Sequence, residues 1–202
     1  MDIPIDHLVY AAPTLEAGIA AVERRFGRRA TPGGQHPAWG TRNALLGLGP
    51  TVYLEIIAPA PDLPPPAEGR PFGIDALEAP QLVTWALKAP ALEDQVRRAA
   101  RQGLVLGAIR AGRRRRDDGR LLTWRLTDPY TVHGDGLVPF LIDWGETEHP
   151  ARSLPQIGQL EYLHLTHPEP DRIRTLLAVL DVDLPVGRGK SPALSMELSK
   201  HP

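Results

Sequence analysis

Three stretches of the chain share one pattern of hydrophobic and polar positions. They cover residues 3–13, 82–90 and 160–168, and each is a short apolar run with β-type alternation, closed by proline and followed by a helical pattern. In the helical segments apolar residues recur every three or four positions, the spacing that one buried helix face requires. The first helix shows this spacing at Leu15, Ile19, Val22 and Phe26. A motif that recurs in this way predicts a duplicated unit.

Two of the three units continue after the helix with further strand-like runs. In the first unit these runs are 39–48 and 51–57, separated by Gly49-Pro50. In the second unit they are 121–127 and 137–144, separated by Asp128-Pro129 and a glycine-rich loop. The order is therefore strand, helix, then two or three strands, twice over.

The unit boundaries follow from these elements. We expect a first unit over 1–60, a second over 81–147 and a third over 158–202. The third unit is incomplete, because after its helix it offers only 193–198 as a strand. The chain has 22 prolines, roughly twice the ordinary frequency of about 5%. Many of them fall in 61–80, which we interpret as an extended connector within what is effectively one compact domain.

Bulk properties restrict the partners. The 202 residues carry a net charge of -1 and are 42% hydrophobic, so the chain is an ordinary globular protein with no bias toward nucleic acid or acidic membranes. Without cysteine it has no disulfide, thiolate nucleophile or thiolate metal ligand. No apolar run approaches the roughly 20 residues that cross a bilayer, and no signal-peptide pattern begins the chain. We therefore expect a cytoplasmic protein, and we expect no nucleotide cofactor.

Residues 113–116 are four consecutive arginines, the one dense charge run. Asp117 and Asp118 follow at once, and adjacent charges of both signs are typical of a solvated surface turn. We favour a solvated hairpin loop over an anion-binding loop.

His7 and Glu55 are each a polar residue in the middle of an apolar strand. Strand alternation sends Ile5, His7 and Val9 to one face, and Asp6 to the other. If the strands of His7 and Glu55 are neighbours, the two side chains converge, and imidazole and carboxylate suit zinc, iron, manganese or nickel. A His-Glu hydrogen bond, or a strand edge where Glu55 reaches water, is the alternative.

At these residues the chain resembles the vicinal oxygen chelate superfamily, which includes glyoxalase I, extradiol dioxygenases and bleomycin-resistance proteins. The resemblance rests on the paired units, with histidine in the first strand (DHLVY, 6–10) and glutamate in the last (YLEI, 53–56). The segments 33–43 and 139–145 are similar to the bacterial glyoxalase-like branch. The resemblance implies an α+β fold, in which tandem βαβββ units form a curved sheet cup, with a partial third βα unit at the C-terminus.

The resemblance also implies metal ligands taken from equivalent positions in both units. The first unit would give His7 and Glu55. In the second unit the repeat places Thr84 opposite His7, and threonine is a poor ligand. It places Leu141 or Asp143 opposite Glu55, so a set of His7, Glu55 and Asp143 would leave positions open for water and substrate.

Several other residues are candidates for the site. His36 lies in a glycine-rich segment that we expect to be a loop, where it acts as general base or substrate clamp, or else faces water in a tight turn while Trp39 fills the core. Asn43, Thr41 and Arg125 can bind a carboxylate or carbonyl, and Trp39, Thr84 and His164 are further candidates for substrate binding. His149 is a weaker candidate of the same kind.

The third unit carries His164 and His167 in its strand. Tyr162 is the position equivalent to His7, and His164 has the same parity. His164 therefore faces the same cavity if this strand joins the sheet; otherwise it is a core or edge histidine. We expect His167, at the strand end, to be exposed.

Two functions fit the sequence. The first is a divalent-metal-dependent lyase, isomerase or dioxygenase, with His36 or Glu55 moving the proton of a small substrate that has neighbouring oxygens. The second is a metal-free cup that sequesters a small apolar or aromatic molecule. Thr84 favours the second, whereas His7 and Glu55 favour the first. The sequence leaves open whether the two full units pair within one chain or across a homodimer.

Overall fold

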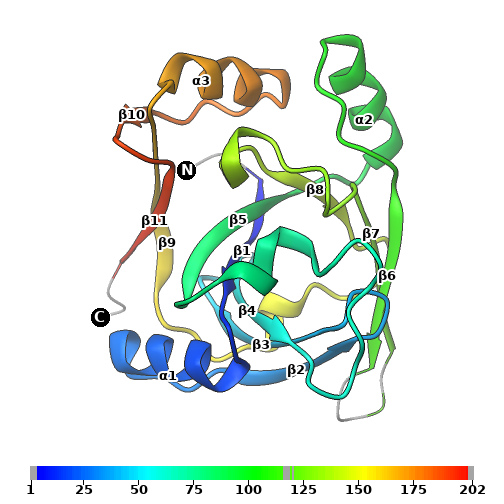
Figure 1. Ribbon diagram of the computed structural model, residues 1–202, viewed down its shortest axis with the longest axis vertical. Helices are drawn as coiled ribbons and strands as arrows, with labels where there is room; N and C mark the ends of the chain where they lie inside the picture. The colour runs from blue at the N-terminus through cyan, green and yellow to red at the C-terminus, as the bar shows by residue number, and fades with distance from the viewer. Residues whose placement is uncertain (1–3, 116–118, 120, 200–202) are drawn as a thin grey trace.

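The computed structural model describes residues 4–115, 119 and 121–199. Figure 1 shows a strongly curved sheet in the middle of the molecule, with helices around its outside. The first unit contributes β1 (Ile5–Ala11), α1 (Leu15–Phe26), β2 (Thr31–His36), β3 (Thr41–Gly47) and β4 (Tyr53–Pro59). The second contributes β5 (Gln81–Lys88), α2 (Leu92–Arg101), β6 (Arg110–Arg115), β7 (Leu121–Leu126) and β8 (Phe140–Asp143).

These strands form one eight-stranded sheet in the order β2-β3-β4-β1-β5-β8-β7-β6. Each unit pairs its first strand in parallel with its last, β1 with β4 and β5 with β8. The units join through the antiparallel pair β1 and β5 in the centre, so they pair within a single chain. The curvature brings the two edge strands, β2 and β6, into contact with each other, and the sheet is nearly closed. The expected α+β cup is confirmed.

Local signals in the sequence define the first helix. The Thr14 side chain accepts a hydrogen bond from the Ala17 amide at 3.2 Å, which satisfies one of the free donors at the start of α1. Gly27 ends the helix in the left-handed conformation (φ 69°), and its amide bonds the Glu23 carbonyl. The apolar stripe of α1 then packs on the outside of the sheet.

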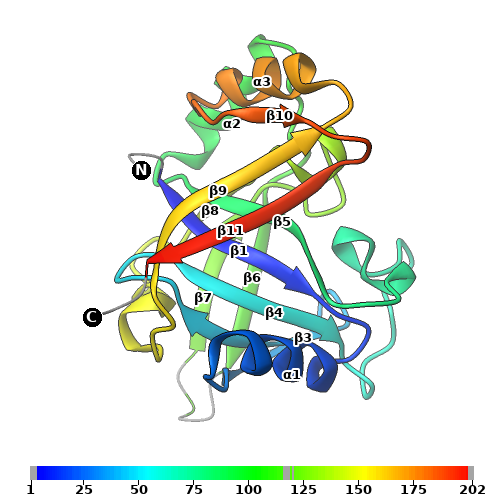
Figure 2. The same ribbon diagram turned by 90° about the vertical axis from the view of Figure 1, so that its left-hand side faces the viewer.

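The third unit consists of β9 (Gln159–His167), α3 (Pro170–Val179), β10 (Val186–Arg188) and β11 (Ala193–Ser199). It forms a separate sheet in the order β10-β9-β11, which lies across the outer side of β1 and β5 (Figure 2). Its buried residues Leu163 and Met196 belong to the same apolar cluster as Leu8 and Trp85 of the main sheet. The third unit therefore covers the outer face of the cup and does not extend the sheet.

Two predictions about local structure are wrong. The glycine-rich segment before Trp39 is not a loop, because residues 31–36 form β2 and His36 ends that strand. The arginine run is not mainly a loop, because Arg113 and Arg114 lie within β6 and Arg114 is buried. Residues 116–118 of that prediction lie outside the described residues.

Three short 3-10 segments complete the described part of the chain. The connector 61–80 contains η1 (Pro71–Ala76), and η2 (Gly134–Gly136) and η3 (Pro150–Ser153) flank β8. The inner face of the cup holds a second apolar cluster, which includes Val9, Trp39, Trp124 and Phe140. Among the described residues, no helix has the length and apolar character needed to cross a membrane.

Candidate functional site

His7 and Glu55 meet inside the cup. β1 and β4 are parallel neighbours in which Glu55 lies opposite Val9, one pleat along from His7 on the same face. The His7 Nε2 atom is 3.7 Å from Glu55 Oε2, and both residues are buried. We expected the two side chains to converge if their strands were neighbours, and the structure meets that condition.

Further polar side chains, from β3 and β2, adjoin His7 and Glu55. Asn43 Nδ2 donates a hydrogen bond to Glu55 Oε1 at 2.6 Å and lies 3.4 Å from His36 Nε2. His36 Nδ1 lies 3.0 Å from Thr41 Oγ1. Because an amide nitrogen only donates, His36 Nε2 is the acceptor and His36 Nδ1 carries the proton. We call His7, His36, Asn43 and Glu55 the polar cluster.

Burial keeps the His36 ring neutral. Removal from water lowers the pKa of His36 to about 4, helped by the charge of Arg114 and opposed by Glu55. With its pKa lowered this far, the neutral His36 ring can accept a hydrogen bond at neutral pH, but it is a weak base. His36 therefore suits ligand positioning better than proton abstraction.

Asp6 also reaches the polar cluster, although alternation assigns it to the opposite face. The pairing of β1 with β5 shifts register between Ile5 and His7, so Asp6 is the extra residue of a bulge. A bulge re-aims side chains, and here Asp6 Oδ1 lies 2.7 Å from His7 Nδ1. Burial acts to raise the pKa of Asp6, but hydrogen bonds from His149 and His7 outweigh it and hold the pKa well below its usual range.

Aromatic rings enclose the polar cluster. The His7 ring stacks on Tyr53 with centroids 4.7 Å apart, and Phe140 meets it edge-on at 5.4 Å. The cavity between these groups measures about 40 Å³, enough for only a few water molecules. Trp39 and Trp124, with centroids 6.1 Å apart, form its outer wall.

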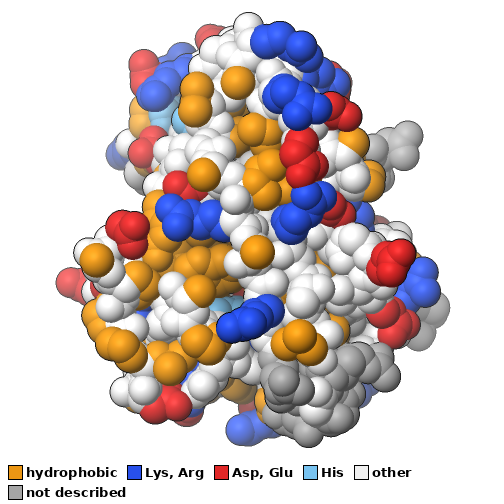
Figure 3. All heavy atoms as spheres, turned by 90° about the vertical axis from the view of Figure 1, so that its right-hand side faces the viewer, with side chains coloured by type: hydrophobic (Ala, Val, Ile, Leu, Met, Phe, Trp, Pro, Cys, Tyr) orange, Lys and Arg blue, Asp and Glu red, His pale blue; other side chains and the backbone are white. Residues whose placement is uncertain are grey.

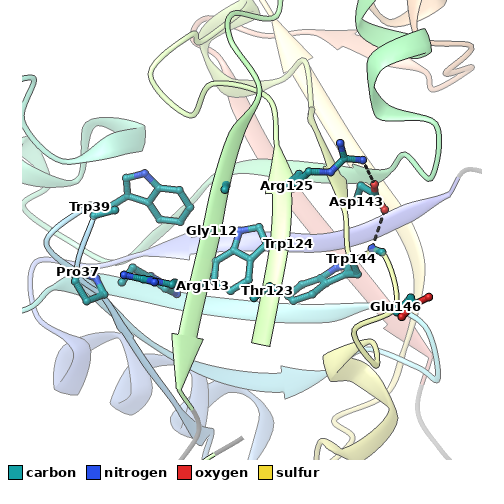
Figure 4. Close-up of a pocket in the computed structure, with 14 residues that line it drawn as sticks. Pro37, Trp39, Gly112, Arg113, Thr123, Trp124, Arg125, Asp143, Trp144 and Glu146 are labelled. Atoms are coloured by element: carbon teal, nitrogen blue, oxygen red, sulfur yellow. Dashed lines mark hydrogen bonds and ion pairs between the residues drawn. The ribbon is translucent and has the colours of Figure 1, made fainter. Parts of the chain in front are cut away.

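A larger pocket of about 740 Å³ lies on the other side of that wall. Seen from the β6 side, the surface is hollowed and hydrophobic side chains line the hollow, with basic side chains around it (Figure 3). Figure 4 shows three indoles across the pocket, those of Trp39, Trp124 and Trp144. His36 also lines both spaces, so the pocket leads to the polar cluster.

Asp143 lies apart from His7 and Glu55. Its Oδ2 pairs with the Arg125 guanidinium at 2.5 Å, and Arg125 also contacts Glu93 (Figure 4 draws the first contact). Within residues 4–115, 119 and 121–199, no three histidine or acidic residues come close enough to hold a metal ion. Catalytic zinc sites take three protein ligands, and His7 and Glu55 supply two, so these residues alone do not make up such a site.

The strand register explains the missing ligands of the second unit. In the first unit, Glu55 lies two residues beyond Tyr53, the partner of His7. In the second unit Ala86 pairs with Phe140. Once Thr84 is matched to His7, the position equivalent to Glu55 is therefore Phe140. Matching the ends of the predicted strands gives Leu141 or Asp143 instead of Phe140. The two matches differ because β8 begins at Phe140, later than the apolar run 137–144 from which the strand was predicted.

Other candidates from the sequence lie elsewhere. Thr84 is buried but lines a different hollow, beside η1 and η2. Arg125 is on the rim of the large pocket. His164 pairs with Glu197 at 3.1 Å on the exposed face of the third unit, because β9 does not join the main sheet. His167 is buried rather than exposed, and its Nε2 lies 2.9 Å from Asp135.

Several residues of the site could not be predicted from the sequence. Asp6 was assigned to the wrong face because a single-residue bulge leaves no trace in the hydrophobic pattern. Tyr53, Trp124 and Phe140 resemble ordinary core residues until the inner face of the cup is known. Arg114, which lines the small cavity, was concealed in a charge run.

Comparison with known proteins gives a family and a fold. The sequence profile described as "Glyoxalase-like domain" matches residues 5–180. A hypothetical protein from Staphylococcus aureus superposes with a TM-score of 0.70 at 14% identity, over 94% of this chain and 87% of the other. A methylmalonyl-CoA epimerase from Mycobacterium tuberculosis gives a TM-score of 0.44 at 18% identity, over 72% of this chain and 92% of the epimerase. None of the curated proteins matches.

Proposed function

Because the chain belongs to the glyoxalase-like domain family of the vicinal oxygen chelate superfamily, we propose that it binds a small organic molecule inside its cup. The observation that carries this proposal is the 740 Å³ pocket, lined by three indoles and leading to the polar cluster. Small-molecule sites in proteins have this size and combine apolar walls with a few fixed polar groups. A flat ligand would stack on the indoles and direct an oxygen or nitrogen toward His36 and Asn43.

The residues of the cup favour the second function expected from the sequence, a metal-free cup that sequesters a small molecule, which Thr84 also favours. His7 and Glu55 alone give two protein ligands, and the second unit supplies Phe140 and Thr84 at the equivalent positions. The aromatic ring at Phe140 packs against His7 at 5.4 Å, which places apolar surface beside the two donors. Elemental analysis of the purified, untagged protein beside a His7→Ala variant measures directly whether an ion is carried.

The experiment is a ligand screen by thermal shift and tryptophan fluorescence, with aromatic acids, dicarbonyls, catechols and hydroxy acids. A ligand in the pocket is expected to raise the melting temperature and to change the fluorescence of Trp39 and Trp124. Trp39→Phe and Trp124→Phe should each reduce that fluorescence change. Trp85→Phe is the matched control, because Trp85 is fully buried and donates to the Leu137 carbonyl away from the pocket. If no class of compound shifts either signal, binding in the cup is contradicted.

A second candidate function is proton transfer on the bound molecule, as in a lyase or isomerase. The contact of His7 Nε2 with Glu55 Oε2 at 3.7 Å favours it, because an imidazole beside a carboxylate is a suitable acid-base pair. The test is incubation of each bound compound in D₂O with NMR detection of deuterium at the carbon next to a carbonyl. Glu55→Gln keeps the shape of the side chain and should abolish the exchange. Binding without exchange would leave the sequestering function alone.

A further inference from the structure

Asp6 is a fully buried carboxylate on which three side-chain donors converge. Its Oδ1 is 2.7 Å from His7 Nδ1, and its Oδ2 is 3.1 Å from Trp144 Nε1 and 3.0 Å from His149 Nε2. A buried charge is costly unless hydrogen bonds replace its water, and these three donors supply that replacement. The carboxylate is therefore ionised and acts only as an acceptor.

Because the Asp6 carboxylate only accepts, it determines which ring nitrogen of His7 and of His149 carries a proton. His7 has to carry its proton on Nδ1, and its Nε2 is left toward Glu55 and the cavity. His149 has to carry its proton on Nε2, which agrees with its Nδ1 accepting a bond from the Ala151 amide at 3.3 Å. The two histidines thus take opposite tautomers because they approach one carboxylate through different nitrogens.

The same carboxylate holds a wall of the pocket. Trp144 lines both the small cavity and the large pocket, and its indole N–H bonds Asp6. Trp144 also packs against Trp124 at 5.3 Å and against His149 at 5.9 Å. One side chain on β1 thereby connects the histidine at the base of the site with the segment after β8.

We propose that Asp6 is a positioning residue, which holds His7 in the Nδ1–H tautomer so that Nε2 faces the ligand, and which fixes Trp144 as a wall of the same site. This inference rests on the proposed binding function for its purpose. The bulge in β1 is the structural reason that it is possible, since a regular strand would place Asp6 on the other face. Metal-binding and catalytic histidines are commonly oriented by such a carboxylate.

The test is the tautomer of His7 in the ligand-free, full-length protein, measured by NMR of ¹⁵N-histidine-labelled samples. His7 is assigned by the signal that disappears in His7→Gln. At a pH where the His7 ring is neutral, the wild-type protein is expected to carry the ring proton on Nδ1. The opposite tautomer in the wild type overturns the proposal, whether or not any variant folds.

Asp6→Asn replaces the acceptor by a group that can also donate, so His7 is expected to lose the Nδ1–H signature, and the indole N–H resonance of Trp144 is expected to shift. Trp144→Phe and His149→Phe are matched controls, because each removes one other donor and leaves the contact between Asp6 and His7. They should keep the wild-type tautomer of His7. If the controls change it as Asp6→Asn does, Asp6 only docks the segment and the proposal is wrong.

The outcomes separate this inference from the proposed function. The tautomer is measured without ligand, so a failed ligand screen does not alter it. A ligand that binds in the cup of a protein whose His7 carries its proton on Nε2 would support the binding function and overturn the role of Asp6.

Discussion

Asn43 is the residue on which the polar cluster depends most directly. Its amide donates a hydrogen bond of 2.6 Å to Glu55 Oε1, and both residues are buried. A buried acceptor that loses its partner retains the full cost of its desolvation, whereas an exposed one recovers a bond to water. The network is therefore sensitive to single deletions.

Asn43→Ala is expected to lower the free energy of unfolding by about 1–3 kcal/mol, because it leaves the Glu55 carboxylate without this donor. Urea denaturation at neutral pH measures the change. Gln35→Ala is the control: it removes a bond of similar length to Asp62, but an exposed one, and should cost less than about 0.5 kcal/mol. Equal losses in the two variants would mean that burial of the bond is unimportant.

His36 makes the stability of the protein depend on pH. In the unfolded chain its pKa is about 6.5, whereas burial lowers the folded pKa to about 4. Below pH 6.5 the unfolded state binds a proton that the folded state does not, so stability is lost as the pH falls from about 6.5 to about 4. The full loss is on the order of 3 kcal/mol.

Denaturant titrations between pH 7 and pH 4, on wild type and His36→Gln, test this dependence. The variant should lack the component of the slope that His36 contributes in that range. Asp6 acts at lower pH, because a depressed carboxyl pKa loses its stabilising effect only below the ordinary pKa of 3.8. An unchanged slope in His36→Gln would mean that the buried ring is not neutral.

His7 and Glu55 could be predicted from the sequence because a polar residue inside an apolar strand has few explanations, and alternation assigns its face. The same rule failed for Asp6, its immediate neighbour. One unpaired residue in β1 locally reverses the alternation of side chains between the two faces of the sheet. In a single sequence this alternation is the only evidence for the face on which a side chain lies. Trp144 and His149, which both bond Asp6, lie far from it in the chain. Their contacts with Asp6 could therefore not be predicted either.

At the level of elements, the two strands of the main sheet that were not predicted are its two edges, and the short β10 of the third unit was not predicted either. β2 contains Pro32 and two glycines, and β6 is largely arginine. Both compositions are rare in central strands, but edge strands tolerate them because one side needs no ladder of hydrogen bonds. The central strands β1, β4 and β5 were recognised because burial on both faces makes them apolar.

β6 also contains a glycine, Gly112, and the structure shows why no larger residue fits at this position. A Cβ atom there would lie 2.3 Å from ring atoms of Trp124, which crosses the strand at that point. Gly112→Ala should therefore displace the indole and cost about 1–3 kcal/mol, with a shift in tryptophan fluorescence. Gly187→Ala in β10 is the control, since its nearest contact would be an ordinary 3.4 Å. A Gly112→Ala variant as stable as wild type would contradict the close packing of Trp124 on β6.

For the whole molecule, the internal repeat was the informative signal, because it predicted the order of strands in both units. It did not reveal where the third unit would lie. Leu163 of β9 packs in one cluster with Leu8 and Trp85, so the outer face of the cup and the third unit share a core. Elements with a shared core are expected to unfold together.

Leu163→Ala is therefore expected to destabilise the whole chain by about 2–5 kcal/mol. All four tryptophans lie in the first two units, so their fluorescence reports the main sheet. The fluorescence midpoint should fall together with the circular dichroism midpoint. A variant that shifts only the dichroism signal would show that the third unit is an independent domain.

The small volume behind Trp39 and Trp124 also has a kinetic consequence. With about 40 Å³ available, no organic molecule reaches His7 until these rings move aside. Arrival at the indoles is then a diffusive encounter, and entry is a separate, slower step governed by side-chain rearrangement. The observed association rate should consequently level off as ligand concentration rises, and the same rearrangement limits escape, so a weakly attracted molecule would still have a long residence time.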